Sequence, residues 1–203
     1  MKSHSKKFIF IHIPKTAGNA VQKVLMPHSE EKIYRESYKE GKLNDFEVEN
    51  ELGICKKHEW IGAYIENPDT LLHPFNEYHK FCVVRNPWER MVSWYCYTFP
   101  RISKQVDKDH FLENGLGKNM PTMLSYISYD NKNHMDSVIR YEKLEESLKE
   151  VCNKINVPFE GFEVTNASKH PHYSEFYNDK SYTKVSSFYK EDIEYFNYNY
   201  EEL

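Results

Sequence analysis

Short apolar runs alternate with amphipathic segments along the chain, and each run predicts one element. Residues 8–13 form a short apolar run that ends at Pro14, which predicts a buried strand. Residues 81–84 are continuously apolar, which is typical of a strand covered on both faces, and residues 137–141 predict a third strand. A segment with helical spacing follows each of these runs. This order predicts an α/β fold with a central parallel sheet flanked by helices.

Helical spacing extends over most of the remaining chain. The clearest amphipathic helix is predicted at residues 142–155, and the other helices are predicted at 21–25, 60–65, 87–99, 120–129 and 181–196. Residues 28–50 are rich in Glu and Lys with weak periodicity, so we expect exposed loop and short helix there, with 47–55 as a candidate helix. Residues 101–119 are charged and predict a surface excursion.

The length, net charge and cysteine content of the chain exclude several classes of protein. The length of 203 residues suits one domain, 1–203, and the net charge of −4 argues against binding nucleic acid by bulk attraction. Four scattered cysteines form no C-x-x-C pair, which favours a reducing cytoplasm over a disulfide framework or a zinc knuckle. The N-terminal segment lacks the apolar core of a signal peptide, and no stretch is long enough to span a bilayer.

The loop after the first predicted strand has the composition of an anion site. Lys15 supplies an ammonium group, Thr16 a hydroxyl, and Gly18 allows close backbone approach. The first N–H groups of the following helix lack intrahelical partners, and the positive end of its dipole faces the loop. Because the lysine precedes the glycine, the ATPase pattern G-x-x-x-x-G-K-[ST] is missing. We therefore predict a P-loop-like site for a phosphate-like ligand; an ordinary strand–turn–helix with a surface lysine is the alternative.

A second basic group follows the second predicted strand. Arg85 comes directly after that strand, Asn86 can cap the next helix, and Pro87 suits its first turn. Arg90 and Ser93 are three residues apart and share a helix face. Open α/β sheets bind ligands at the carboxyl ends of their strands, so these side chains are expected near a ligand.

Taken together, the two blocks resemble the sulfotransferases that use 3′-phosphoadenylyl sulfate. Residues 13–18 (IPKTAG) are similar to the 5′-phosphosulfate loop of that family, and residues 84–95 (VRNPxxRxxSxY) to its 3′-phosphate site. The resemblance is greatest to the carbohydrate sulfotransferase branch and its small bacterial relatives. It covers most of the chain, though little of 28–50 and 101–135. Asn19 departs from it, because the family usually has Thr or Ser there.

The resemblance implies transfer of a sulfuryl group from 3′-phosphoadenylyl sulfate to an acceptor hydroxyl, on a carbohydrate in that branch, with adenosine 3′,5′-bisphosphate as product. In this chemistry Lys15 would neutralise the bridging or leaving oxygen, and no metal is required. Arg90 has a second interpretation, in which it braces its helix through Glu89 or another acid. The residues implied to contact the donor are Lys15, Thr16, Ala17, Gly18, Asn19, Arg85, Arg90 and Ser93, together with Ser168 and Lys169 of a late loop. The alternative for Ser168 and Lys169 is a solvated loop without a ligand.

The acceptor hydroxyl needs a general base near neutral pH. We predict His58, because it opens a helix between the two blocks and related sulfotransferases carry a histidine at this place. A surface histidine that caps the helix, or a carboxylate base, is the alternative. His12 follows the strand alternation and is expected to be structural. His170 and His172 form an H-x-H pair without a matching ligand cluster, so we predict no metal site.

Two other functions stay open from the sequence. A kinase-like phosphotransferase would need Mg²⁺ ligands, commonly an acid after a buried strand, where this chain has Arg85. A non-catalytic nucleotide-binding module of the same fold would not need Lys15 together with a base. The identity of the acceptor is expected to depend on residues 28–50 and 101–135, the segments with the weakest patterns.

Overall fold

The computed structural model describes residues 1–34, 37–38, 42–43, 47–49, 57–100, 105–116, 120–161 and 170–201. The chain forms two compact units. Unit 1 contains Met1–Val84 and Ser125–Thr165, and unit 2 contains Arg85–Leu124 and Asn166–Leu203. Among the described residues, no helix is both long and apolar enough to cross a membrane.

The strands of the described residues are short, and all of them lie in unit 1. They are β1 (Lys2–Ser3), β2 (Phe8–Ile11), β3 (Lys32–Tyr34), β4 (Ser37–Tyr38), β5 (Lys42–Leu43), β6 (Glu47–Glu49), β7 (His79–Val84), β8 (Ser128–Tyr129), β9 (Lys132–Asn133) and β10 (Ser137–Arg140). The α-helices are α1 (Gly18–Leu25), α2 (Ile61–Glu66), α3 (Pro87–Thr98), α4 (Lys108–His110), α5 (Met123–Ile127), α6 (Leu144–Lys154), α7 (Asp179–Phe188) and α8 (Lys190–Phe196). Single helical turns occur at η1 (Met26–His28), η2 (Pro68–Thr70), η3 (Phe75–Glu77), η4 (Phe111–Gly115), η5 (Tyr141–Lys143) and η6 (Tyr173–Phe176).

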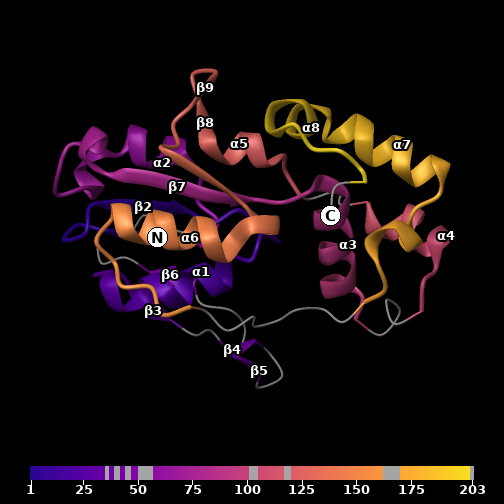
Figure 1. Ribbon diagram of the computed structural model, residues 1–203, viewed down its shortest axis with the longest axis horizontal. Helices are drawn as coiled ribbons and strands as arrows, with labels where there is room; N and C mark the ends of the chain where they lie inside the picture. Colours follow the sequence, from indigo (N-terminus) through magenta and orange to yellow (C-terminus); the bar gives the residue numbers. More distant parts are fainter. Residues whose placement is uncertain are drawn as a thin grey trace. The chain divides into compact units, whose positions relative to one another are not determined.

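The central sheet of unit 1 has the strand order β1-β2-β7-β10. Its two inner strands, β2 and β7, are labelled in Figure 1. β2 pairs in parallel with β7, and β7 in parallel with β10, whereas the short β1 is antiparallel to β2. The three strands predicted from the apolar runs are therefore the parallel core of the sheet. This confirms the predicted α/β fold with a central, mostly parallel sheet.

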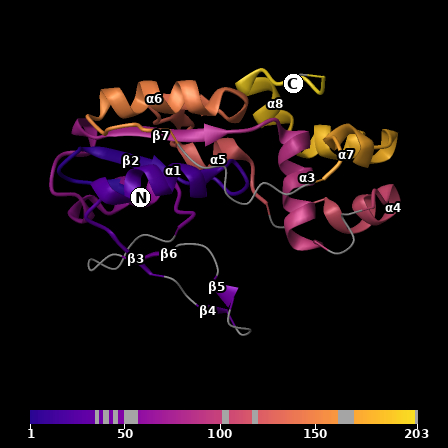
Figure 2. The same cartoon turned by 60° about the horizontal axis from the view of Figure 1, so that its bottom comes forward.

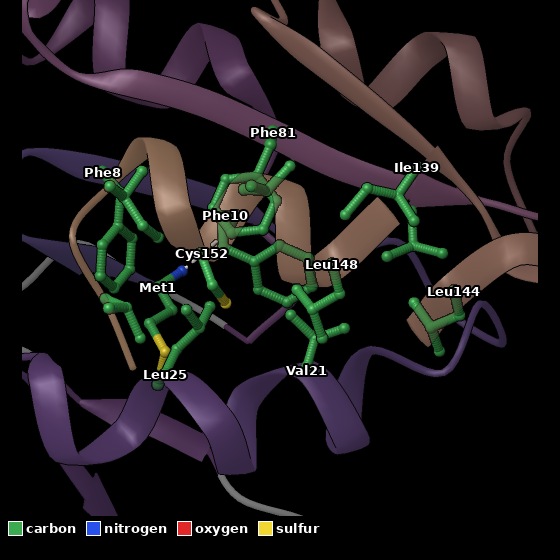
Figure 3. Close-up of a cluster of buried hydrophobic side chains, with 14 residues drawn as sticks. Met1, Phe8, Phe10, Val21, Leu25, Phe81, Ile139, Leu144, Leu148 and Cys152 are labelled. Atoms are coloured by element: carbon green, nitrogen blue, oxygen red, sulfur yellow. Dashed lines mark hydrogen bonds between the residues drawn. The ribbon is translucent and has the colours of Figure 1, made fainter. Parts of the chain in front are cut away.

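Helices α1 and α6 bury one face of this sheet. Phe8 and Phe10 of β2 and Phe81 of β7 belong to a buried cluster with residues of α1 and α6. Figure 3 shows side chains from these strands and helices gathered in one core. Ile9 and Ile11, the alternate residues of β2, are also buried. Because both faces are covered, the strand is continuously apolar rather than alternating.

The polar stretch after α1 differs from its prediction. Instead of loop and short helix, β3 pairs with β6 and β4 with β5, both antiparallel. The helical interpretation of residues 47–55 is wrong for Glu47–Glu49, which alternates polar, apolar and polar residues in the two-residue period of a strand. Residues 50–56 lie outside the described part of the chain.

The described elements of unit 2 are helical (Figure 2). Asn86 caps α3 as predicted, because its side chain accepts from the backbone N–H groups of Trp88 and Glu89. The predicted helix 181–196 is two helices, α7 and α8, that meet at Tyr189. The surface excursion predicted at 101–119 is wrong for Phe111, which is fully buried and packs edge-to-face on Tyr95.

Candidate functional site

The loop between β2 and α1 has a backbone suited to an anion. Lys15 and Ala17 have φ angles of +66° and +65°, which side-chain-bearing residues rarely adopt. Each such residue costs about 1–3 kcal/mol and persists only where the surrounding structure enforces it. Ala17 directly precedes α1, which has no side-chain cap. The first N–H groups of α1 therefore point into the loop without intrahelical acceptors, an arrangement that favours anions.

The hydroxyl of Thr16 has a different role from the predicted one. Thr16 is buried, and its Oγ1 donates to the backbone oxygen of Ile13 at 2.9 Å. The hydroxyl therefore closes the loop rather than donating to a ligand. A contact between Thr16 and the donor would be made through its backbone N–H.

Asn19 lies in the first turn of α1 and does not cap it, because the cap position is Ala17. Its Oδ1 is buried and has no hydrogen-bond partner among the described residues. The two ends of an amide are interchangeable by rotation, so the same position can present an NH₂ donor. Because this end of the side chain is buried, a contact between Asn19 and a ligand stays a prediction, and the feature of the loop that suits an anion is its backbone N–H groups.

The ring of His12 packs against Gly18, the first residue of α1. A Cβ added to Gly18 would lie 2.0 Å from Cδ2 of His12, so only glycine allows this approach. The His12 ring is buried, stacks on Phe10, and lies edge-to-face against His58. Burial, followed by the nearby His58 and Lys57, holds the pKa of His12 well below its ordinary value. A neutral, packed ring agrees with the predicted structural role.

His58 is held against the end of β2. Its Nδ1 lies 2.8 Å from the backbone oxygen of His12, the residue directly after β2. A carbonyl can only accept, so Nδ1 carries the proton and Nε2 has the lone pair of the neutral ring. The ring itself is exposed. The capping alternative is wrong, because α2 begins at Ile61 and its cap position is Trp60.

In unit 2, Arg85 is fixed from two sides. Its Nη2 contacts Oε1 of Glu89 at 2.9 Å, and its backbone N–H donates to Sδ of Met123 at 3.4 Å. The carboxylate lies one helical turn from the arginine and orients its guanidinium. Ser93, on the same helix as Glu89, is also buried. Arg85 and Ser93 are therefore both buried residues of unit 2.

Arg90 is a brace. It is 0% exposed, and its Nη1 donates to the backbone oxygen of Pro121 at 3.0 Å. Its predicted role as a contact to the donor is not supported, because a side chain with no accessible surface cannot touch a ligand. The second interpretation, bracing through an acid, agrees with the nearby Asp192. The acid is not the neighbouring Glu89, which pairs with Arg85.

Asp192 is a residue that the sequence analysis missed. Its carboxylate accepts from the backbone N–H groups of Met123 and Leu124 at 2.7 and 2.8 Å. Burial raises its pKa, against the opposing effect of these two bonds and of Arg90. The available signal was its position: Asp192 lies seven residues after Val185, on the apolar stripe of the predicted helix. Ser168 and Lys169, the other predicted donor contacts, lie outside the described residues.

The comparisons with known proteins bear on the class of enzyme. A family model described as the sulfotransferase family matches residues 1–199. The chain belongs to the sulfotransferase family. This match spans residues of both units of the sulfotransferase, including the Lys15 loop and the Arg85 segment. No curated protein and no solved structure matched the chain.

Membership of the family makes the protein a transferase of sulfuryl groups to hydroxyl acceptors. The structure of this sulfotransferase brings His58 to the strand that leads into the Lys15 loop. Within the described ranges, no group of three or more His, Cys, Asp or Glu side chains is placed to hold a metal ion.

Proposed function

We propose that this sulfotransferase transfers a sulfuryl group from 3′-phosphoadenylyl sulfate to a hydroxyl of a carbohydrate, as a single-domain cytoplasmic enzyme. The observation that carries the proposal is the bond between Nδ1 of His58 and the backbone oxygen of His12. It fixes a basic nitrogen next to a loop whose backbone suits an anion. Three described cysteines, Cys82, Cys96 and Cys152, are buried free thiols, which supports a reducing compartment.

In the proposed reaction, His58 and Lys15 act on opposite ends of the transfer. Nε2 of His58 accepts the proton of the acceptor hydroxyl while the acceptor oxygen forms its bond to sulfur. The bond between sulfur and the bridging oxygen breaks, and the leaving phosphate keeps the electron pair. The Lys15 ammonium and the first N–H groups of α1 stabilise the charge that develops there. The donor supplies the activated sulfur as a phosphosulfate anhydride.

The remaining donor contacts are proposed from the family resemblance. The backbone N–H groups of residues 16–19 are assigned to the 5′-phosphosulfate, and Arg85 and Ser93 to the 3′-phosphate. The pair between Arg85 and Glu89 supports this assignment, because an oriented guanidinium can grip a phosphate with two parallel bonds. Ser168 and Lys169 are retained from the resemblance alone.

Calorimetric titration tests the donor assignment. The protein is titrated with adenosine 3′,5′-bisphosphate, AMP and ATP–Mg²⁺, and the bisphosphate is expected to bind tightest. Arg85→Ala should weaken it by about tenfold or more, the usual scale for losing a charged hydrogen-bond partner. A preference for ATP–Mg²⁺ would favour the kinase-like alternative. Binding of the bisphosphate without turnover on any acceptor would favour the non-catalytic module.

Turnover with labelled donor tests the two catalytic assignments. Lys15→Ala should lose far more turnover than affinity for the bisphosphate, whereas Lys23→Ala, on the exposed side of α1, should change neither. His58→Asn is the sharper variant, because an Asn amide N–H can keep the bond to the His12 carbonyl while the base is lost. It should lower kcat/KM by about 10²–10⁴-fold and abolish the acid limb of the pH profile. An unchanged pH profile would indicate that a carboxylate, and not His58, is the general base.

A further inference from the structure

Unit 2 contains a cavity that the donor assignment does not use. Its volume is about 700 Å³, within the range of about 300–1,000 Å³ that is usual for ligand sites. Its lining consists of three tyrosines, two asparagines and two acids, contributed by the start of α7 and by residues 199–201. All of these residues belong to unit 2.

The aromatic wall of the cavity is firmly held. Tyr182 stacks on Trp88 with an interplanar angle of 3° and a centroid distance of 5.8 Å, yet it is 40% exposed. Tyr177 is buried, and its hydroxyl donates to the backbone oxygen of Trp88 at 2.9 Å. A rigid aromatic surface that stays accessible can cover an apolar ligand face at little cost in side-chain entropy.

The charge of the lining excludes anions. Among the residues that the structure describes, the charged members of the lining are Asp179 and Glu201, and none is a lysine or arginine. Phosphate and sulfate groups need cationic or N–H donors, so this cavity does not suit the donor nucleotide. The carboxylates of Asp179 and Glu201 instead offer acceptors to a ligand with several hydroxyl groups.

The packing of the rings also argues against a quaternary ammonium ligand. Such a cation is recognised by aromatic rings that surround it, each within about 6 Å. Here Tyr200 packs edge-to-face on Tyr182 and on Tyr177, with centroid distances of 5.0 and 5.7 Å. At these distances the rings contact one another, and no cation fits between the members of either pair. A flat, hydroxyl-rich ligand that lies across the rings fits better.

The cavity is connected to the segment proposed to bind the donor. The backbone oxygen of Asn199, on the cavity wall, accepts from Nδ2 of Asn86 at 2.9 Å. Asn86 follows Arg85 directly and caps α3. A ligand in the cavity would therefore bind next to residues of the same unit that serve the reaction.

We infer that this cavity is a saccharide subsite that binds a neutral sugar ring of the acceptor. The CH-rich face of the ring lies on Tyr182, and its hydroxyl groups bond to Asp179 and Glu201. The role of the subsite in catalysis depends on the proposed function, but the binding of the sugar does not.

Direct binding without donor tests the subsite. The full chain is titrated with lactose, maltose, cellobiose and N,N′-diacetylchitobiose, followed by ligand-observed saturation-transfer NMR, with choline as a counter-probe. At least one disaccharide should bind saturably with a Kd of about 1 mM or tighter. Tyr182→Ala and Asp179→Asn should each weaken it by about tenfold. Tyr195→Ala, which removes a tyrosine that is 52% exposed on α8 and outside the lining, is the matched control.

The outcomes separate the two proposals. Failure of all four sugars to bind, equal binding by Tyr182→Ala and the control, or stronger binding of choline than of any sugar would overturn the subsite. Urea unfolding of each variant shows whether its fold is kept, and titration with adenosine 3′,5′-bisphosphate tests the donor assignment separately. Saturable sugar binding by a chain that does not bind the bisphosphate would support the saccharide subsite and contradict the proposed function.

Discussion

Replacing Gly18 by alanine tests how tightly the loop is packed. The added Cβ would lie 2.0 Å from Cδ2 and 2.1 Å from Nε2 of His12. Carbon atoms are in comfortable contact at about 3.5–4.0 Å, so the methyl group and the ring must separate by about 1.5 Å. The ring cannot move away easily, because its centroid lies 4.6 Å from that of His58 and 5.8 Å from that of Phe10.

Two opposing effects decide the sign of this substitution. Gly18 is the first residue of α1, and helix propensity favours alanine over glycine by at most about 1 kcal/mol. Overpacking of a rigid site costs about 1–3 kcal/mol. The overlap is large and the ring is buried, so the upper end of the overpacking cost, about 3 kcal/mol, applies. Subtracting the gain in helix propensity of about 1 kcal/mol leaves a net loss of about 2 kcal/mol, roughly 30-fold in the folding equilibrium.

Urea unfolding at constant m-value measures this loss, and the chain offers a matched control. In Gly62→Ala of α2, the new Cβ would lie 2.3 Å from the indole of Trp60, but that side chain is 37% exposed and can swing into solvent. The control should be neutral or stabilising. In a His12→Ala background, the cost of Gly18→Ala should largely disappear. A stability loss no larger than that of Gly62→Ala would refute the packing argument.

Three further outcomes are expected. Asn86→Ala removes the acceptor for the N–H groups of Trp88 and Glu89 and should lower the unfolding free energy by about 1–2 kcal/mol in urea titration; an unchanged midpoint would contradict the cap. Burial raises the pKa of Asp192, so the folded state binds this proton more tightly than the unfolded state, whose pKa is about 3.9. The stability contribution of Asp192 therefore falls as pH rises from that value through the raised one, and unfolding of Asp192→Asn across this window should lack the fall; parallel curves would refute it. Burial raises the pKa of Cys152 to about 11, so iodoacetamide at pH 8 should label this thiol slowly until urea is added, and equal rates would show that it is accessible.

Local signals made the sheet and the loop predictable. The continuous apolar runs of β2 and β7 identify strands buried on both faces, whatever packs against them. Pro14 and the Asn86–Pro87 pair mark where each strand gives way to the next segment, and the structure has α1 and α3 after them. The paired strands after α1 were missed because β3 and β6 are too short for a two-residue period to stand out from a polar loop.

The position of His58 depends on a contact that no local pattern contains. The sequence predicted a histidine at a helix start, whereas its ring is bonded to a backbone oxygen 46 residues earlier in the chain. A backbone carbonyl carries no residue identity, so nothing in the composition near His12 marks it as the partner. The tautomer that leaves the lone pair on Nε2 follows from this bond alone.

The two arginines of the second block also differ in contacts that no local pattern contains. Arg85 and Arg90 are both basic residues of one short motif, and spacing alone assigns them the same kind of ligand. The partner of Arg85 is Glu89, four residues further along the chain in the first turn of α3, so the orientation of Arg85 is set locally. The partners of Arg90 are the Pro121 carbonyl and the charge of Asp192, 31 and 102 residues further along the chain. A buried guanidinium requires such acceptors, and the packing of unit 2 supplies them, which is why the motif alone could not distinguish the surroundings of the two arginines.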